Sequence, residues 1–360
     1  MTPPPNDSPA QPGRLTAAFA PGRVNLIGEF TDYNDGLALP FAIAAGVTVR
    51  ATALDEPRIT TFAADLGARD EFWLGRERPT PPGWRAFVRG IAAELPAAGL
   101  PVLGASLEIT GTVPRGAGLS SSAALEVALA LSLLALSAAP RVDDLKLAKI
   151  CSRVENEWVG AKTGLLDQLA SLCGRADAAV RIDFRSGEVT EVPVSLGEWR
   201  LVSLDSGQRH QHAQSESGYN ERRRECAQAC AVLGIGSLRD LDPSMLERLP
   251  PPLDLRARHI FEENRRVDAA VAALSANDLF ELGRLLDASH ASQRDLYGVS
   301  TPAVEATVEV MLAAGAAGAR MVGGGFGGHV LGLLPPGIEP PDGAYEVRPS
   351  PGAHLIDATA

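Results

Sequence analysis

Positive charge is scarce in this sequence of 360 residues. Lysine and arginine together number 33, against 44 aspartates and glutamates, which gives a formal net charge of -11 at pH 7. A protein that binds nucleic acid or an anionic membrane needs a clustered basic surface to neutralise phosphate groups. The charge balance therefore argues against nucleic acid and membranes as partners.

Cysteine is rare as well, with four residues at positions 151, 173, 226 and 230. Their spacing gives no paired framework of the kind that holds small secreted domains together. Cys226 and Cys230 are separated as on one face of a helix, not as in the C-x2-C of a zinc knuckle. We expect reduced thiols in a reducing compartment.

The sequence also lacks a recognisable export signal and a membrane span. Residues 1–13 are rich in proline and polar side chains, without a cationic segment and an apolar core after it, so we expect a disordered tail. The most apolar run, residues 123–139, contains Glu126 and two serines and is too short to span a bilayer comfortably. It reads as a core helix, and we expect a cytoplasmic protein that acts as a monomer.

The hydrophobic pattern predicts an α+β protein. Short β-branched runs between residues 15 and 74 predict a mostly antiparallel sheet, followed by a helix over 84–95 and a strand over 106–114. Helical spacing recurs over 142–158, and strands return at 178–184 and 199–207. Long helical patterns then run to about residue 315, and strand-like segments close the chain. This order predicts two lobes, residues 14–200 and 201–360.

The loop PRGAGLSSSA, residues 114–123, leads directly into the most apolar helix. A helix buried at its far end presents free N–H groups and positive dipole at its start, which together form an anion site. Small residues let a phosphate approach the backbone, and hydroxyls can donate to its oxygens. The alternative is an ordinary glycine turn with a serine N-cap. A Walker P-loop is excluded, because no G-x-x-x-x-G-K-[ST] occurs.

A second glycine-rich segment, GGGFGG at residues 323–328, fits G-x-G-x-x-G by chance. A dinucleotide-binding turn would need a helix to open at its third glycine. Here a short apolar run follows, which two prolines stop, so a strand is favoured. We expect these glycines to mark a tight crossing against a neighbouring loop.

The third notable segment is GRVNLIGEFTDYNDG, residues 22–36. Its glycines and turn-forming residues can hold Arg23, Glu29 and Asp32 toward one spot. Ionised carboxylates there would suit sugar hydroxyls, since each oxygen accepts a charge-assisted hydrogen bond. The pattern is equally compatible with solvated loop charges and a surface Arg–Asp pair.

Together these segments resemble the galactokinase family of GHMP small-molecule kinases. GRVNLIGEFTDYNDG is similar to the galactokinase signature, GLSSSAA to the nucleotide loop and GGGFGG to the third motif, and KTGLLDQLAS and SGYNERRREC follow in the same order. The resemblance covers nearly the whole chain. It implies the two-lobed GHMP kinase fold, with mixed or antiparallel sheets, helices and a site in the cleft between lobes. It also implies Mg²⁺-dependent transfer of the γ-phosphoryl group of ATP to the anomeric hydroxyl of galactose.

The resemblance assigns roles residue by residue. Asp167 matches the catalytic aspartate, and Arg23 matches the arginine beside it at the anomeric hydroxyl. The sugar-binding positions are Glu29, Phe30, Asp32, Gly164 and Tyr219. The ATP-binding positions are Gly116, Gly118, Leu119, Ser120, Ser121, Ser122 and Ala123. Ser122 and Glu155 match the Mg²⁺ ligands, although the run of serines leaves the register open by one residue.

Several alternatives stay open at this point. Asp167 could be a helix N-cap, and Glu155 could be a charge at the rim of the site. Phe30 replaces the usual histidine of the family, and His329 replaces a small residue or cysteine after GGGFGG. Relatives that act as sugar sensors keep the same fold and binding motifs but transfer nothing, because a shared fold does not fix the activity. Within the enzyme class, a kinase for N-acetylgalactosamine or arabinose is the nearer alternative.

Overall fold

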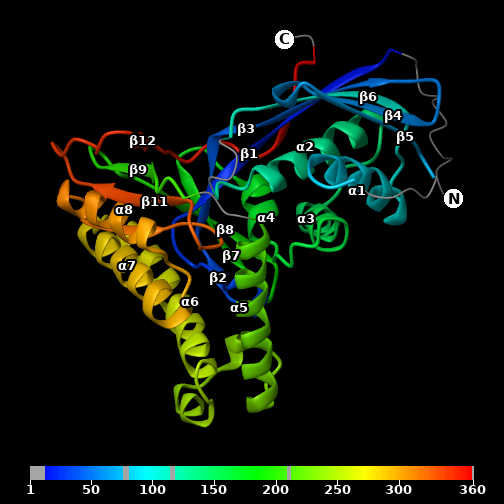
Figure 1. Cartoon of the computed structure of the whole chain (residues 1–360). Helices are drawn as coiled ribbons and strands as arrows, with labels where there is room; N and C mark the ends of the chain where they lie inside the picture. Colours follow the sequence, from blue (N-terminus) through cyan, green and yellow to red (C-terminus); the bar gives the residue numbers. More distant parts are fainter. Residues whose placement is uncertain (1–12, 76–80, 114–117, 209–211, 359–360) are drawn as a thin grey trace, which may run out of the picture.

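The structure is a computed structural model that describes residues 13–75, 81–113, 118–208 and 212–358. The predicted N-terminal tail therefore lies outside the described residues, except for Gly13 at its end. Elsewhere the helices and strands follow the predicted order along the chain (Figure 1).

A six-stranded sheet forms the first layer. Its strands lie in the order β13 (His354–Ile356), β1 (Leu15–Asn25), β3 (Pro40–Ala53), β6 (Ala105–Gly111), β4 (Arg58–Ala63) and β5 (Ala68–Trp73). All neighbours are antiparallel except β4 and β6. The predicted sheet over residues 15–74 is therefore confirmed, and the C-terminal strand β13 closes it at the edge.

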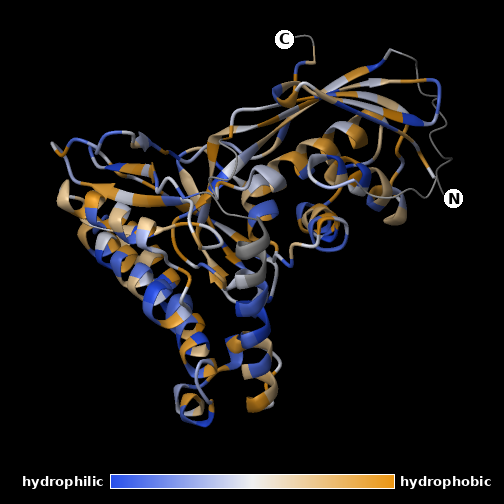
Figure 2. Cartoon of the chain, viewed as in Figure 1, coloured by the Kyte–Doolittle hydropathy of each residue, from blue (hydrophilic) through white to orange (hydrophobic). Residues whose placement is uncertain are grey.

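Helices cover one face of this sheet. They are α1 (Trp84–Ala97), α2 (Ser121–Leu136), α3 (Asp144–Arg153) and α4 (Leu166–Cys173). Of the 16 residues of α2, 12 are buried, because a helix that is apolar all round has no face suited to water. Figure 2 shows its hydrophobic colouring. The predicted core helix is thus confirmed, and within the described residues no helix meets the length and apolarity of a membrane span.

The helix predicted over residues 142–158 differs in one respect. It is α-helical only over Asp144–Arg153 and then widens into a π-helical segment, Val154–Val159. Hydrophobic periodicity does not distinguish these two kinds of turn over so short a stretch. Similar single π turns often occur at functional sites, because they change the direction in which side chains point.

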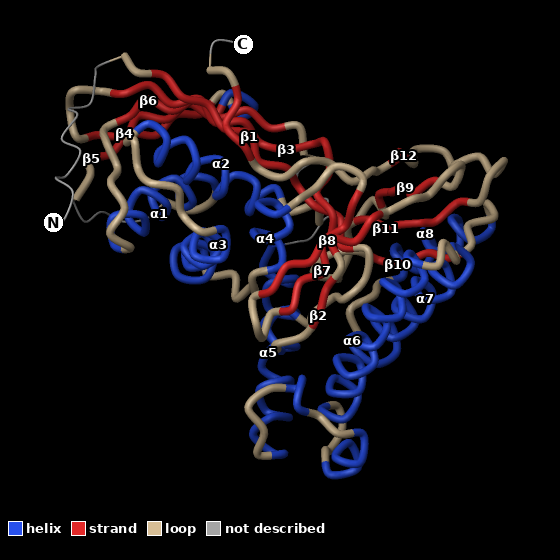
Figure 3. Tube along the Cα trace, turned by 180° about the vertical axis from the view of Figure 1, so that it is seen from behind, coloured by secondary structure: helices blue, strands red, loops and turns tan. Residues whose placement is uncertain are grey.

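The C-terminal half contains a four-stranded antiparallel sheet. Its strands lie in the order β10 (Gly318–Met321), β11 (His329–Leu334), β9 (Arg200–Asp205) and β12 (Tyr345–Glu346). The long helices are α5 (His212–Leu233), α6 (Leu253–Ser275), α7 (Leu279–Ser292) and α8 (Pro302–Ala313). Helices α7 and α8 lie against β10, and α5 pairs with α6 (Figure 3).

A small third sheet connects the two halves. It consists of β2 (Leu37–Ala38), β7 (Ala178–Asp183) and β8 (Glu188–Pro193). Seen from behind, it lies between the large sheet and α6 (Figure 3), and both β2 and β8 contact α6. Strand β8 was not predicted, because its side chains are mostly polar and exposed. Short 3-10 helices and a further π turn complete the fold: Asp32–Asn34, Ala64–Leu66, Leu238–Asp240, Pro243–Arg248 and Gln293–Tyr297.

Candidate active site

A cavity of about 1230 Å³ is lined by residues from both halves of the chain. Typical small-molecule sites occupy roughly 300–1,000 Å³, so this cavity is larger than the usual site for one small molecule. The lining includes these predicted site residues: Arg23, Glu29, Phe30, Asp32, Gly118, Leu119, Ser120, Ser121, Ser122, Glu155, Gly164, Asp167 and Tyr219. Ala123 is fully buried and is not part of the lining, and Gly116 lies outside the described residues.

The centre of the site is an ion pair between the end of β1 and the first turn of α4. Arg23 approaches Asp167 Oδ1 with Nε at 2.8 Å and Nη2 at 2.7 Å. Its Nη1 also donates to the Gly118 carbonyl at 2.6 Å. The Arg23 side chain is 7% exposed and that of Asp167 is 23% exposed, so this is no solvated surface pair. Asp167 is not an N-cap either, since Leu165 holds that position.

Strand β1 reaches the loop before α2 through a local irregularity. The register between β1 and β3 shifts between Pro21 and Arg23, and such bulges re-aim side chains. A side chain at Gly22 would lie 2.5 Å from the Leu119 carbonyl, so only glycine permits this approach. The Arg23 backbone N–H then donates to the same carbonyl at 3.1 Å. This packing fixes Arg23 relative to the loop.

The serines at the start of α2 do not cap the helix in the usual way. Ser120 occupies the N-cap with a left-handed backbone (φ 58°) and makes no capping hydrogen bond. Its hydroxyl instead donates to Asp167 Oδ2. The ordinary serine-cap interpretation is therefore wrong, and the start of a buried helix faces the cavity next to Ser121 and Ser122.

Ser122 lies next to Glu155, which settles which serine approaches that carboxylate. The Ser122 hydroxyl donates to Glu155 Oε1 at 2.8 Å, while Thr163 Oγ1 (2.8 Å) and Gln168 Nε2 (3.0 Å) donate to Oε2. Glu155 is 5% exposed, so it is not a rim charge. Burial and the charge of Asp167 raise its pKa, and these hydrogen bonds partly oppose the shift.

Hard oxygen ligands are what Mg²⁺ prefers, and Ser122 and Glu155 supply a hydroxyl and a carboxylate at one place. Among the described residues no cluster of three or more His, Cys, Asp or Glu side chains is arranged for a metal. A two-ligand site fits Mg²⁺ that keeps water and phosphate oxygens as its other ligands. Thr163 and Gln168 were missed from sequence, although Gln168 directly follows Asp167.

Asp32 and Gly164 fit together closely. A side chain at Gly164 would lie 2.1 Å from Asp32 Oδ2, so the glycine makes room for the carboxylate. Burial, followed by the negative charges of Asp167 and Glu29, raises the pKa of Asp32 to about 7. A carboxyl group with this pKa exchanges its proton near neutral pH. Tyr219, from α5, lines the cavity as well.

Phe30 lines the cavity and also belongs to the core. It is 3% exposed and has a left-handed backbone (φ 67°). Its ring stacks on that of Tyr297 with 4.5 Å between ring centroids. The ring centroids of Tyr219 and His259 lie 6.1 Å and 6.0 Å from that of Phe30. This packing supports the alternative that Phe30 turns inward, with only part of the side chain left to face a ligand.

The glycine-rich segment is a crossing, as predicted. Strand β11 begins at His329, so no helix follows the glycines. A side chain at Gly323 would lie 3.1 Å from the Gly118 carbonyl, which places this turn directly against the loop before α2. The Gly323 N–H donates to Glu29 Oε1 at 2.8 Å.

The cavity also has an aromatic and apolar portion that the sequence did not single out. It includes Trp84, Phe87, Trp158, Leu66 and Pro82. Trp84 and Phe87 lie in α1, and Trp158 lies in the π-helical segment, where an apolar side chain is also typical of a packed core. Nothing in their spacing distinguishes a residue that covers a core from one that lines a pocket.

Comparison with protein families gives three matches. Residues 9–53 match the galactokinase galactose-binding signature, residues 86–175 the GHMP kinase N-terminal domain, and residues 270–349 the GHMP kinase C-terminal domain. The chain is 40% identical to the galactokinase of Streptomyces coelicolor over 88% of its own length and 83% of the relative's. It is 42% identical to that of Mycobacterium bovis over 89% and 90%, respectively.

Solved structures agree with these relatives. The galactokinase of Lactococcus lactis, crystallised with galactose, is 31% identical and superposes with a TM-score of 0.89 over 95% of both chains. The mevalonate kinase of Methanococcus jannaschii superposes with a TM-score of 0.65 at 16% identity, over 95% of this chain and 100% of that one. The second likeness concerns the fold alone.

The raised pKa of Asp32 predicts a pH-dependent effect on stability. Because the native group holds its proton up to about pH 7 and the unfolded group releases it near 3.8, the wild type loses stability as pH rises through this window. Asp32→Asn has no proton to lose. The difference between its melting temperature and that of the wild type should therefore increase in favour of the variant as the pH rises from about 4.5 to about 8. Asp342→Asn, at an exposed position, is the control. A difference in melting temperature that does not change with pH would contradict the assignment.

Proposed function

The chain belongs to the galactokinase family of GHMP kinases, and we propose that it transfers the γ-phosphoryl group of ATP to the anomeric hydroxyl of galactose. The products are galactose 1-phosphate and ADP. The observation that carries this proposal is the contact of Asp167 with both Arg23 and Ser120, at the start of α2. A sugar hydroxyl bound beside Asp167 would lie next to the phosphate site.

In the proposed reaction the Asp167 carboxylate accepts the proton of the anomeric hydroxyl. The hydroxyl oxygen then forms a bond to the γ-phosphorus as the bond to the β-γ bridging oxygen breaks. Phosphoryl transfer needs mainly positioning and charge stabilisation, so few groups are required. Arg23 supplies a cation and aligns Asp167, and the N–H groups at the start of α2 face the phosphates.

Sugar recognition in this proposal falls to the carboxylates of Glu29 and Asp32, with Tyr219 and the backbone at Gly164. Gly118, Leu119, Ser120 and Ser121 would receive the triphosphate. Leu119 is 1% exposed, so only its backbone could take part. The aromatic side chains of Trp84, Phe87 and Trp158 would cover the adenine ring.

We further propose that Ser122 and Glu155 hold Mg²⁺, which would neutralise charge on the phosphates when bound. Thr163 and Gln168 keep the Glu155 carboxylate in a fixed orientation through Oε2. The cytoplasmic location, the monomeric state and a lobe boundary near residue 200 stay predictions from the sequence.

The proposal is tested by ADP release from the purified protein with ATP, Mg²⁺ and a panel of sugars. Galactose should give the largest kcat/KM, ahead of N-acetylgalactosamine and L-arabinose. A different preferred sugar would identify a related kinase. Galactose binding without any ADP release would identify a sensor that transfers nothing.

Replacing the proposed base should remove turnover but leave galactose binding largely intact. Asp167→Asn keeps nearly the same volume but cannot accept the proton, and loss of a general base commonly lowers the rate about 10² to 10⁴-fold. We expect this loss in kcat with galactose affinity within a fewfold of wild type, measured by calorimetry. Asp70→Asn, in an ion pair with Arg89 away from the cavity, is the control. A variant with more than about a tenth of the wild-type kcat would show that Asp167 is not the base.

Phe30 predicts weak discrimination at carbon 6 of the sugar. A histidine there would hydrogen-bond the C6 hydroxyl, and one neutral hydrogen bond contributes about 0.5–1.5 kcal/mol. We therefore expect kcat/KM for galactose to exceed that for 6-deoxygalactose only roughly two- to tenfold, and Phe30→His to increase this ratio. Histidine tolerates the left-handed backbone at this position.

Melting temperatures of both proteins would check that Phe30→His still folds, because the Phe30 ring stacks on Tyr297. A wild-type ratio already above about a thousandfold would contradict the prediction, since such steep rejection requires a polar site. A ratio that the substitution does not change would show that Phe30 serves the core alone.

A further inference from the structure

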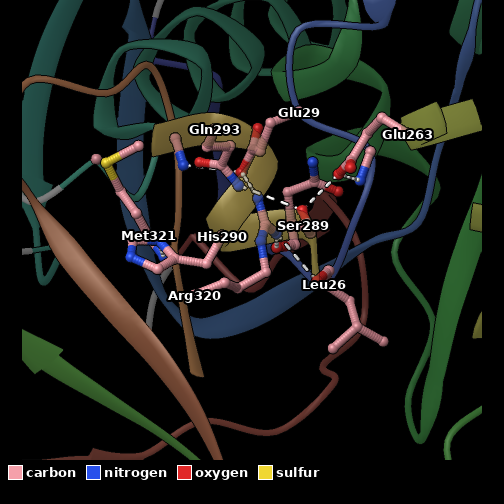
Figure 4. A network of polar contacts seen from close by, with 12 residues as sticks. Leu26, Glu29, Glu263, Ser289, His290, Gln293, Arg320 and Met321 are labelled. Atoms are coloured by element: carbon pink, nitrogen blue, oxygen red, sulfur yellow. Dashed lines mark hydrogen bonds and ion pairs between the residues drawn. The ribbon is translucent and has the colours of Figure 1, made fainter. Parts of the chain in front are cut away.

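Arg320, in β10, is a fully buried cation directly behind the sugar-binding segment (Figure 4). A buried guanidinium is costly unless its donors are paired. Its Nη1 donates to the carbonyls of Asn25 at 2.7 Å and Leu26 at 2.9 Å. Its Nη2 forms an ion pair with Glu29 Oε1 at 3.1 Å. When the Gln293 side-chain amide is oriented so that its oxygen faces the guanidinium, that oxygen accepts a hydrogen bond from Nη2 at 2.8 Å.

The two carboxylate oxygens of Glu29 differ in their contacts. Oε1 is held from two sides, by Arg320 and by the Gly323 N–H at 2.8 Å. Among the described residues no hydrogen bond is made to Oε2, and the atoms of closest approach in the ion pair are Nη2 and Oε1. Glu29 is 4% exposed and yet lines the cavity. Oε2 is therefore the oxygen left to accept a hydroxyl from a ligand.

The charge of Arg320 matters because acids crowd this end of the cavity. Burial is the largest cause of the raised pKa of Asp32, and the negative charges of Asp167 and then Glu29 raise it further. Arg23 is engaged by Asp167, so Arg320 supplies the positive charge next to Glu29. Glu263 also lies near Arg320 but has its own ion pair with Arg266 at 2.6 Å.

We propose that Arg320 is a positioning residue for the sugar: it holds Glu29 Oε1 so that Oε2 faces the substrate. This rests on the proposed function, because it takes galactose as the ligand that Glu29 receives. Arg320 does not touch the substrate. Its contribution should therefore disappear when Glu29 no longer carries a charge to be held.

A double-mutant cycle tests this dependence. Galactose Kd is measured by calorimetry for wild type, Arg320→Met, Glu29→Gln and the double variant. A hydrogen bond to a charged group contributes about 1.5–3 kcal/mol, so Arg320→Met should weaken galactose binding roughly 10- to 150-fold. In the Glu29→Gln background the same change should shift Kd less than about twofold, because the two residues act as a unit.

Controls separate positioning from support of the fold. Arg89→Met breaks an ion pair with Asp70 elsewhere and should leave galactose Kd unchanged. The Kd of a non-hydrolysable ATP analogue should also stay within about twofold in all Arg320 variants. If Arg320→Met does not fold, Arg320→Lys takes its place in the cycle, since it keeps the buried charge but cannot reach all of its partners. The double variant lacks the unpaired Glu29 charge that Arg320→Met leaves behind, so it should be more stable than Arg320→Met.

Equal shifts in both backgrounds, or a lowered melting temperature with an unchanged galactose Kd, would overturn the inference and leave Arg320 a purely structural residue. Wild-type protein that does not bind galactose would instead refute the proposed function. Wild-type protein that binds galactose, together with an additive cycle, would refute only the role of Arg320.

Discussion

The contact between Arg23 and Asp167 is the interaction on which the site depends. Arg23 comes from the end of β1 and Asp167 from the first turn of α4, so one ion pair joins the large sheet to a covering helix. The same guanidinium holds the Gly118 carbonyl, and the same carboxylate receives the Ser120 hydroxyl. Moving any of these groups would separate the proposed base from the start of α2, where we propose that the phosphates bind.

Buried acids elsewhere in the cavity are also balanced by positive charge or by a bound proton. Glu29, Asp32 and Asp167 bring three acids to one region, which would repel one another strongly at low dielectric constant. Arg23 and Arg320 each pair with one of these acids, while burial, and then the charges of Asp167 and Glu29, raise the pKa of Asp32. The fold therefore accepts polar groups in its interior, and in the proposed reaction their pairing sets the orientation in which they meet the substrates.

Most helices and strands could be predicted from the sequence, because a long apolar run such as that of α2 is compatible with few structures other than a buried helix. It failed where local pattern carries no signal. Strand β8 is too polar, and the π turn that holds Glu155 looks helical. The family motifs identified 13 of the residues that line the cavity, but not the contacts among them. Arg320 sits in an ordinary strand, and its partner Glu29 lies at the other end of the chain, so only the tertiary structure brings the pair together.

In the proposed reaction Asp167 receives the anomeric hydroxyl next to the start of α2. A crystal structure of the wild-type protein with galactose and a non-hydrolysable ATP analogue tests it most directly. We expect the anomeric oxygen within about 2.6–3.2 Å of an Asp167 carboxylate oxygen, with the γ-phosphate near Ser120 and Ser121. An anomeric oxygen that points away from Asp167, or a triphosphate bound away from the start of α2, would contradict it.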